Sequence, residues 1–426
     1  MASSIKTIAV VGLGYIGLPT AAMFAAQKVH VVGIDVDQRI VDTINQGQIH
    51  IVEPGLEAIV HHCVSEGYLR ATTRPEAADA FLIAVPTPFK PGHIPDLTYI
   101  EAATKALAPV LAKGNVVILE STSPVGATEQ MVEWLRAARP DLTFPDFANR
   151  DSVPDVHIAH CPERVLPGHV IRELVENDRI IGGMTKSCSE RAADVYRVFV
   201  KGQLFYSDAR TAEMAKLTEN AFRDVNIAFA NELSVICDTL SINVWELIRL
   251  ANQHPRVNIL QPGCGVGGHC IAVDPWFIVN KSPEEARLIR TAREVNDGKP
   301  EWVKAKVRNA VQELISQTGA ESEKDLTIAC LGLAFKADID DLRESPALKI
   351  TMDIADEFKG TVLAVEPNII ALPEKLRKKN VSLRTAGEAI EEADILLLLV
   401  DHSVFRTVER DMLQGKQIVD TRGVWG

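Results

Sequence analysis

The sequence predicts an α/β fold with two parallel-sheet lobes, which are joined by a long central helix and a helical middle region. Both ends of the 426-residue chain alternate short apolar runs with helical patterns, as βαβ units do. The middle of the chain is mainly helical, and the whole exceeds the length of one ordinary domain. We therefore expect three domains, at residues 1–208, 209–320 and 321–426.

In the first lobe, two strands flank a helix close to the N-terminus. Ile8–Val11 and His30–Ile34 are apolar and β-branched, and Leu18–Gln27 between them has helical periodicity. Further strand-like runs lie at Phe81–Val85, Val116–Leu119, Val156–Ala159 and Arg179–Ile181. Strands separated by helices predict a mostly parallel sheet.

A long helix is predicted from Ala209 to about Leu240, because this stretch lacks Gly and Pro and its apolar residues recur three and four apart. Ser207 or Asp208 would cap it, and its length would be about 45 Å. The last lobe is predicted to contain strands at Leu326–Cys330, Thr361–Glu366, Ile395–Val400 and Gln417–Asp420, helices at Ser345–Phe358 and Glu388–Glu392, and a loop at Gly332–Lys336.

The composition excludes several classes of protein. A hydrophobic fraction of 46% argues against disorder, and a net charge of −12 without a basic cluster argues against nucleic-acid binding. Thr7–Gln27 is uncharged, but its three glycines and Pro19 argue against a signal peptide or a membrane span. Seven scattered cysteines predict a reducing, cytoplasmic location, and no cysteine or histidine pairing predicts a metal site.

The GLGYIG motif at residues 12–17 predicts a dinucleotide site. It follows a strand, opens a helix, and is followed 18 residues later by Asp35 at the end of the second strand. Asp35 favours NAD over NADP, although Arg39 would soften its repulsion of a 2′-phosphate. The expected cofactor contacts are Gly12, Gly14, Tyr15, Ile16, Gly17, Asp35, Arg39, Thr87, Ser121, Thr122 and Lys336. Thr87, Ser121 and Thr122 are equally compatible with ordinary turns.

A second group of residues predicts covalent chemistry. Cys270 ends a glycine-rich loop where a helix begins, which favours a thiolate, and Asp274 would share its face if helical. A buried structural cysteine is the alternative. Lys216 and Asn220, four apart on the long helix, would stabilise a reacting oxyanion or form a solvated face. Glu163 ends a strand and is a candidate general base.

Taken in order, these motifs resemble the UDP-glucose/GDP-mannose dehydrogenase family over essentially the whole chain. The match rests on the glycine motif at 12–17, Ser-Thr-Ser-Pro at 121–124, Pro-Glu at 162–163, Lys216 with Asn220, Gly-Gly-His-Cys at 267–270 with Asp274, and Phe-Lys at 335–336 with Arg-Glu-Ser at 343–345. The resemblance implies two Rossmann-like lobes, a homodimer, and an enzyme that oxidises a UDP sugar at C6 to a carboxylate with two NAD.

The resemblance also assigns roles. Cys270 would attack the intermediate aldehyde to give a thiohemiacetal and then a thioester, with Lys216 and Asn220 stabilising the oxyanion. Asp274 would orient or activate water, with Glu163 and Thr122 assisting. Arg256 resembles an arginine that reaches across a dimer interface in relatives. The expected substrate contacts are Glu163, Arg164, Lys216, Asn220, Arg256, Gly267, Phe335, Lys336, Arg343 and Arg422.

Three residues differ from those of family members that oxidise UDP-glucose, and they narrow the expected substrate. Val273, His269 and Pro167 stand where members that oxidise UDP-glucose carry Lys, Ser and Glu. The surrounding patterns resemble the branch that acts on N-acetylated sugars, so the expected substrate is UDP-N-acetyl-D-mannosamine, whose uronate product feeds bacterial surface polysaccharide such as enterobacterial common antigen. The alternatives are UDP-glucose or another UDP-N-acetylhexosamine, a two-electron dehydrogenase of the 6-phosphogluconate type, and a non-catalytic NAD-binding module.

Overall fold

A computed structural model describes residues 5–166, 168–268, 270–318, 322–379 and 381–425. His269 and Pro167, two of the departures noted above, lie outside these residues. The described chain forms two compact units, residues 1–219 with 280–283 and residues 220–279 with 284–426. The division into three domains stays a prediction.

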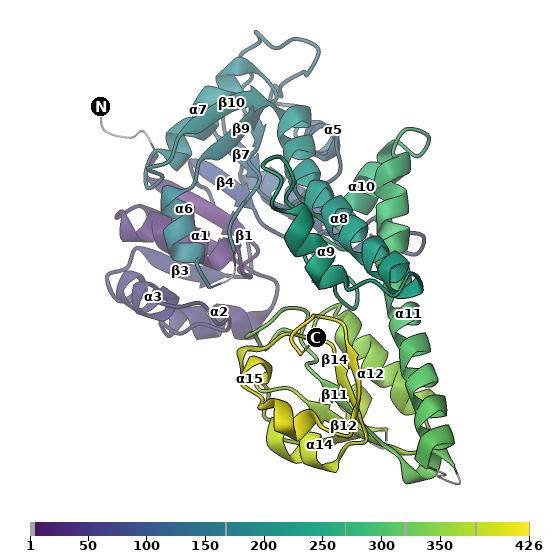
Figure 1. Ribbon diagram of the computed structural model, residues 1–426. Coiled ribbons are helices and arrows are strands. Elements are labelled where there is room, and N and C mark those ends of the chain that lie inside the picture. The colour runs from purple at the N-terminus through teal and green to yellow at the C-terminus, as the bar shows by residue number, and fades with distance from the viewer. Residues whose placement is uncertain (1–4, 167, 269, 319–321, 380, 426) are drawn as a thin grey trace. The chain divides into compact units, whose positions relative to one another are not determined.

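The first unit is built around an eight-stranded sheet in the order β10-β9-β8-β7-β4-β1-β2-β3 (Figure 1). Its strands are β1 Thr7–Val11, β2 His30–Ile34, β3 Leu69–Thr72, β4 Ala80–Ile83, β7 Val116–Leu119, β8 His157–His160, β9 Arg179–Gly183 and β10 Leu204–Asp208. Every predicted strand is present within two residues of its expected bounds, whereas β3 and β10 were not predicted. Neighbouring strands are parallel except β8 and β9, so the sheet is mostly parallel as expected.

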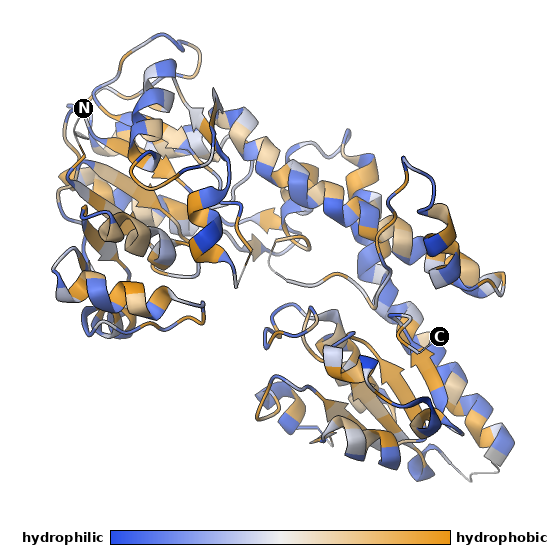
Figure 2. Cartoon of the chain, turned by 60° about the vertical axis from the view of Figure 1, so that its left-hand side comes forward, coloured by the Kyte–Doolittle hydropathy of each residue, from blue (hydrophilic) through white to orange (hydrophobic). Residues whose placement is uncertain are grey.

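Both faces of this sheet are covered. Ile8 and Val10 of β1 belong to one buried apolar cluster, while Ala9 and Val11 belong to another, because successive side chains point to opposite faces. Figure 2 shows the resulting hydrophobic strands at the centre of the layer. The covering helices are α1 Gly17–Ala26, α2 Gln38–Asn45, α3 Leu56–Ser65, α4 Thr98–Leu107, α5 Ala127–Ala138, α6 Val170–Glu176 and α7 Lys186–Tyr196. The strands β5 Phe89–Lys90 and β6 Ile94–Pro95 form a separate antiparallel hairpin.

Two long helices dominate the middle of the chain. The predicted one, α8, spans Ala209–Thr239, and the Asp208 carboxylate caps it by accepting from the Thr211 backbone N–H at 2.9 Å. The second, α11, spans Arg287–Thr318, contains Pro300 and was not predicted. Shorter helices α9 Val244–Ala251 and α10 Asp274–Lys281 lie between them in sequence. None of the helices in the described part of the chain has both the length and the apolar character that crossing a membrane requires.

The second unit contains a five-stranded parallel sheet in the order β13-β12-β11-β14-β15. Ile328 and Cys330 of its central strand face one apolar cluster, and Ala329 and Leu331 face another, so this sheet is also covered on both sides. Its elements are β11 Thr327–Leu331, α12 Pro346–Glu357, β12 Thr361–Val365, α13 Glu374–Arg377, β13 Val381–Leu383, α14 Ala386–Glu392, β14 Ile395–Leu398, α15 Ser403–Arg406 and β15 Gln417–Asp420. The strands and helices predicted for this lobe are confirmed within two residues.

Candidate functional site

The glycine turn between β1 and α1 has the geometry that a pyrophosphate needs. Gly12 has φ +89°, and a Cβ there would lie 2.6 Å from the Ala84 carbonyl oxygen. A Cβ on Gly17 would lie 1.8 Å from the Gly12 oxygen, so the close contact between turn and helix requires glycine there. Gly14 is exposed and a Cβ on it would meet nothing within 4 Å. The open side of the turn is therefore at Gly14, next to exposed Tyr15 and half-buried Ile16.

The acidic residue after β2 supports this turn directly. Asp35 is half-buried and accepts hydrogen bonds from the Leu13 and Asp37 backbone N–H groups, each at 3.0 Å. Arg39 pairs with Asp37 at 2.7 Å, and its side-chain hydrogen bond lowers the pKa of Asp37 to about 2. The Arg39 charge is therefore paired with Asp37, and the Asp35 carboxylate lies against the turn at the end of β2. The turn and the acid fit NAD.

Three further predicted cofactor residues lie on the loops after β4 and β7. The Ser121 hydroxyl donates to the Val85 carbonyl at 2.7 Å and so ties the two loops together. The Thr87 hydroxyl oxygen is buried and has no hydrogen-bond partner among the described residues. Thr122 is half-buried next to Ser121. An unpartnered buried hydroxyl is a feature that a bound ligand would satisfy.

Glu163, the predicted general base, lies in a buried charged cluster that the sequence did not indicate. Its carboxylate pairs with Arg179 at 2.9 Å and accepts from the Arg164 backbone N–H at 2.6 Å. The guanidinium of Arg179 lies 4.6 Å from the centre of the Tyr196 ring, and the Tyr196 hydroxyl donates to Glu120 at 2.6 Å. Arg179 lies nearer to Glu163, at 2.9 Å, than to Glu120, at 3.9 Å, so Glu163 is the carboxylate that it pairs with most directly. Burial raises the pKa of Glu120 to about 7.

Two predicted substrate residues of the same unit lie on or against α8. Lys216 is half-buried on this helix, one turn before Asn220. The Arg164 side chain pairs with Glu219 of α8 at 2.7 Å. The helix thus holds Arg164 through Glu219, and it carries Lys216 itself.

The second unit brings Cys270, Asp274 and Asn220 together. Cys270 is exposed, so the alternative of a buried structural cysteine is wrong. The Asp274 backbone N–H donates to the Cys270 carbonyl at 2.8 Å, and the Asn220 side-chain amide donates to the buried Asp274 carboxylate at 2.5 Å. Helix α10 begins only at Asp274, so Cys270 precedes the helix in a turn and does not share a helical face with Asp274, as the spacing had suggested.

The glycine-rich loop before Cys270 packs against the loop that follows β11. A Cβ on Gly267 would lie 2.6 Å from the Glu344 carbonyl oxygen and 2.9 Å from the Phe335 Cβ. Gly268 has φ +83°, and a Cβ there would lie 3.1 Å from the Phe335 ring. Phe335 therefore lies next to the Cys270 loop. Its role as a substrate contact stays a prediction.

The predicted cationic residues of this unit differ in their surroundings. Arg343 pairs with Asp341 at 2.7 Å, and Arg422 pairs with Asp401 at 2.6 Å and reaches the Pro262 carbonyl at 3.4 Å. Lys336 and Arg256 are exposed. Arg422 is thus the cation that touches the start of the Cys270 loop.

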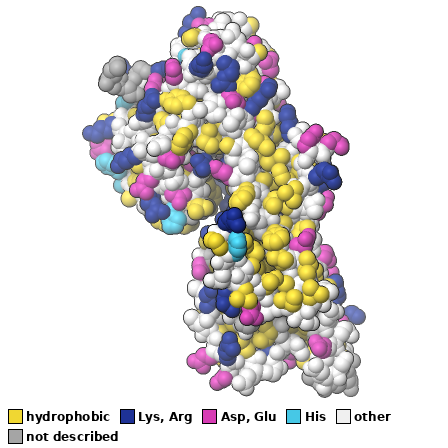
Figure 3. Space-filling view, turned by 45° about the horizontal axis from the view of Figure 1, so that its top comes forward, with side chains coloured by type: hydrophobic (Ala, Val, Ile, Leu, Met, Phe, Trp, Pro, Cys, Tyr) yellow, Lys and Arg dark blue, Asp and Glu magenta, His cyan; other side chains and the backbone are white. Residues whose placement is uncertain are grey.

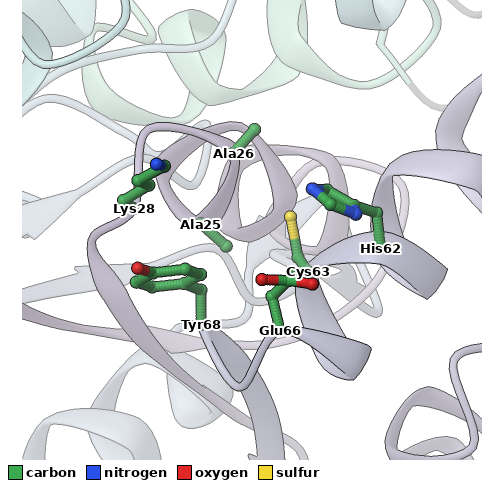
Figure 4. A pocket seen from close by; sticks show the side chains of 7 residues that line it. All are labelled: Ala25, Ala26, Lys28, His62, Cys63, Glu66 and Tyr68. Atoms are coloured by element: carbon green, nitrogen blue, oxygen red, sulfur yellow. The ribbon is translucent and has the colours of Figure 1, made fainter.

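A hollow of about 240 Å³ lies elsewhere in the first unit, between the C-terminal end of α1 and α3 (Figure 4). Lys28, His62, Cys63, Glu66 and Tyr68 are among its lining residues. The glycine turn lies at the opposite, N-terminal end of α1, so this hollow is not part of the dinucleotide site.

Comparison with known proteins agrees with this arrangement. Residues 6–200, 210–298 and 329–426 match the NAD-binding, central and UDP-binding domains of the UDP-glucose/GDP-mannose dehydrogenase family. The chain is 62% identical to an NDP-N-acetyl-D-galactosaminuronic acid dehydrogenase of Ralstonia nicotianae, covering 99% of this chain and 96% of the relative. It is 60% identical to a UDP-N-acetyl-D-mannosamine dehydrogenase of Escherichia coli, covering 99% and 100%.

Solved structures give the same result. A UDP-N-acetyl-mannosamine dehydrogenase from Staphylococcus aureus has a TM-score of 0.83 and 42% identity, covering 98% of this chain and 95% of that structure. A corresponding enzyme from Pyrococcus horikoshii has a TM-score of 0.84 and 38% identity, covering 98% and 96%. The chain therefore belongs to the UDP-glucose/GDP-mannose dehydrogenase family.

Proposed function

We propose that this protein oxidises UDP-N-acetyl-D-mannosamine at C6 to UDP-N-acetyl-D-mannosaminuronate, using two NAD for each sugar. The observation that carries this proposal is the exposed Cys270, whose turn is hydrogen-bonded to Asp274, while Asp274 is bound by Asn220. A two-electron dehydrogenase or a non-catalytic NAD-binding module has no use for this arrangement. Relatives of that name at 60% identity over the full chain support the substrate.

The cofactor is NAD, held by the open turn at Gly14 and by Asp35. When bound, NAD supplies a hydride acceptor for each of the two oxidations. The chain's own contribution in this region is to bind the pyrophosphate at the N-terminus of α1 and to accept a hydrogen bond from the ribose at Asp35.

The reacting thiol keeps the sugar bound between the two oxidations. The Cys270 sulfur adds to the C6 aldehyde carbon to form a thiohemiacetal, and loss of two further electrons leaves a thioester. Water then adds to the thioester carbon, the carbon–sulfur bond breaks, and the carboxylate and the Cys270 thiol are released. A covalent tether of this kind prevents escape of the reactive aldehyde.

The proposed partners of the thiol have distinct tasks. Lys216 supplies positive charge, and Asn220 an amide donor, to the developing oxyanion. Asp274, held by Asn220, orients the attacking water, with Glu163 and Thr122 assisting as base and water ligand. Lys336, Arg343 and Arg422, together with Phe335 and Gly267, bind the UDP sugar from the second unit.

Another UDP-N-acetylhexosamine is the second candidate substrate. Relatives named for N-acetylgalactosaminuronic acid are 62% identical to this chain, as similar as those named for N-acetylmannosamine. Both names share the N-acetyl group, which supports an N-acetylated sugar over UDP-glucose.

We also propose that two copies of this chain associate through α8. Phe222, Phe229 and Ile236 are exposed at seven-residue spacing and therefore line one side of this helix, at 70%, 53% and 45% exposure. Figure 3 shows hydrophobic side chains gathered on one face of the molecule. Such a stripe fits a second copy of itself, with Arg256 exposed for contact, and a solution mass of twice 46.6 kDa is the expected result. The buried thiols support a cytoplasmic location.

The test of the function is the stoichiometry of NADH and uronate on a panel of UDP sugars. We expect two NADH per UDP-N-acetyl-D-mannosamine and a lower kcat/KM for the galacto isomer and for UDP-glucose. Cys270→Ser should stop after partial oxidation, with free aldehyde at no more than one NADH per sugar. Cys237→Ser, which changes a buried thiol in an apolar cluster, is the matched control and should keep two. One NADH per sugar from the unmodified protein would contradict the proposal.

A further inference from the structure

The two long helices are joined by a buried polar seam. Within the second unit, Asp224, Asn231 and Ser234 of α8 face Arg293, Asn296 and Lys299 of α11, and each of the six is less than 8% exposed. The contacts advance in the same direction along both helices, so α8 and α11 run parallel here. We define these six residues as the polar seam.

The seam is a continuous set of hydrogen bonds. Arg293 and Asn296 both donate to the Asp224 carboxylate, at 2.7 and 2.8 Å, and Asn231 donates to the Asn296 amide oxygen at 2.8 Å. Lys299 donates to the Ser234 hydroxyl at 2.5 Å, and Ser234 donates to the Asn231 carbonyl at 2.6 Å.

A seam of this kind is a costly way to join two helices. Well-packed apolar residues of similar volume are often equally stable or more stable than buried charged groups. The hydrogen bonds of the seam instead restrict the orientation of the groups that make them, although the Asp224 Oδ2 and Arg293 Nε atoms have no hydrogen-bond partner among the described residues. The positions of the seam residues are therefore set by the directions of their hydrogen bonds as well as by packing.

One link leads from the seam to the loop that carries Cys270. The Asn231 amide oxygen accepts from the Gly263 backbone N–H at 2.8 Å, and Gly263 opens that loop. A backbone N–H can only donate, so the Asn231 oxygen faces Gly263 and its nitrogen faces Asn296. The Asn296 nitrogen must then face Asp224. A single chain of hydrogen bonds therefore runs from the buried Asp224 carboxylate through Asn296 and Asn231 to Gly263.

The other end of the same loop is held by the same helix. Asn220, one turn before Asp224 on α8, binds Asp274, and Asp274 is hydrogen-bonded to Cys270. Helix α8 thus holds residues 263 and 274 at two points that are about 16 Å apart along its axis. Between these two points the chain contains four glycines, at 263, 265, 267 and 268, and without attachment such a segment would have many conformations.

We propose that Asn231 is a positioning residue for the Cys270 loop, through the hydrogen bond that its amide oxygen accepts from the Gly263 backbone N–H. The expected effect on the oxidation rests on the proposed function of Cys270, whereas the hydrogen bond between Asn231 and Gly263 does not. Loss of the Asn231 link frees the start of the loop, and the sulfur then meets the aldehyde carbon less often. The aldehyde escapes before the second oxidation.

The experiment compares Asn231→Ala with Asn296→Ala in the full-length protein. Both changes break the seam and lower the melting temperature, but Asn296→Ala leaves the Gly263 link in place. We expect Asn231→Ala to fall from two NADH per sugar towards one, with aldehyde captured by hydroxylamine, and its Cys270 to react about tenfold more slowly with iodoacetamide at pH 7. Asn296→Ala should keep two NADH per sugar and the reactivity of the unmodified protein.

Two further variants separate positioning from stability. Asp238→Asn alters a half-exposed ion pair with Lys306 between the same helices and should change neither readout. Asn231→Asp keeps an oxygen that faces Gly263, and we expect it to keep two NADH per sugar whatever its stability. The proposal would be overturned if Asn231→Asp or Asn296→Ala formed fewer than two NADH per sugar, in proportion to the fall in its melting temperature.

A measurement on the unmodified protein covers the case in which Asn231→Ala does not fold. The Gly263 amide should exchange its hydrogen as slowly as the buried amides of α8, and rapid exchange would overturn the proposal. The exchange and alkylation readouts do not depend on turnover. If no UDP sugar is oxidised, the proposed function fails while these two measurements still decide the role of Asn231.

Discussion

The two lobes contain the same turn and use it differently. In the first, Gly12 has φ +89° and donates to Ile34 at the end of the neighbouring strand at 2.8 Å. In the second, Gly332 has φ +91° and donates to Val365, also at 2.8 Å. The next residue in each turn donates its backbone N–H to an acidic side chain, Leu13 to Asp35 and Leu333 to Glu366.

The turns differ in how far they are open. Asp35 is half-buried, and Gly14 beside it is open to a ligand. Glu366 is 3% exposed, accepts from both Leu333 and Ala334, and contacts the fully buried His402 at 3.0 Å. The second His402 nitrogen accepts from the Asp338 N–H, so the nitrogen facing Glu366 carries the proton. The acid of the first turn is half-buried, whereas the acid of the second is fully engaged in holding the loop that bears Phe335 and Lys336.

The largest expected effect is on stability. Glu366→Ala leaves His402 and two buried backbone N–H groups without their acceptor, so we expect a loss of about 3–5 kcal/mol in the free energy of unfolding. Asp35→Ala should cost about 1 kcal/mol and should mainly weaken NAD binding. Urea denaturation and NAD titration of both variants give the comparison, and equal losses of stability would refute it.

The next effect concerns cofactor binding alone. A Cβ on Gly14 meets no protein atom, so Gly14→Ala should unfold at the same urea concentration as the unmodified protein. The methyl group would lie where the pyrophosphate approaches, and we expect the Kd for NAD to rise about tenfold or more. Gly332→Ala is the counterpart, because its Cβ would lie 2.4 Å from that of Val400 and should destabilise the protein. Normal NAD affinity in Gly14→Ala would show that the open turn is not the cofactor site.

The smallest effect is a difference in pH dependence between the lobes. Hydrogen bonds from His402 and from backbone N–H groups outweigh burial and lower the pKa of Glu366, so its contribution is present above its unfolded pKa of about 4.3 and is lost on further acidification. Burial raises the pKa of Glu120 to about 7. Between about pH 4.3 and 7, Glu120 therefore carries a proton in the folded state that it does not carry in the unfolded state. The free energy of unfolding falls as the pH rises through this range.

Glu120→Gln tests the second of these effects. The amide stays neutral, so the variant should lose less stability than the unmodified protein between pH 5 and pH 8, by about 1–3 kcal/mol. Urea denaturation at the two pH values measures the difference. Glu129→Gln, which alters an exposed pair with Arg210, is the control, and an equal pH slope in the unmodified protein and in Glu120→Gln would contradict the assignment.

Much of the fold could be predicted because its strands are unusually apolar. Most of the expected strands are buried on both faces of their sheet, and such strands appear in the sequence as continuous hydrophobic runs. The edge strand β15 is the exception, because Ile418 is exposed while Val419 is buried. Helix α11 could not be predicted in the same way. Pro300 interrupts its pattern, and Arg293, Asn296 and Lys299 are residue types that normally face water. They are buried here because α8 offers an equally polar face, and no local pattern in either segment reports that pairing.

The candidate site divides along similar lines. Cys270, Asp274 and Asn220 were predicted from their spacing and residue types, and the structure joins both Cys270 and Asn220 to Asp274, although Cys270 does not share a helical face with Asp274. Arg179 was seen only as the start of a strand, although it pairs with Glu163. The His402–Glu366 contact joins residues 36 positions apart. Pairs that meet only through the fold leave no periodic signal in the sequence.

The distribution of the cysteines has a practical consequence. Six of the seven are buried, each in the interior of one of the two units, and burial raises the pKa of Cys161 above its usual range and that of Cys330 to about 12. A maleimide dye or spin label added briefly at neutral pH will therefore attach at position 270 without removal of the other thiols. The rate of this labelling, measured with and without a UDP sugar or NAD, tests whether Cys270 lies in the proposed site.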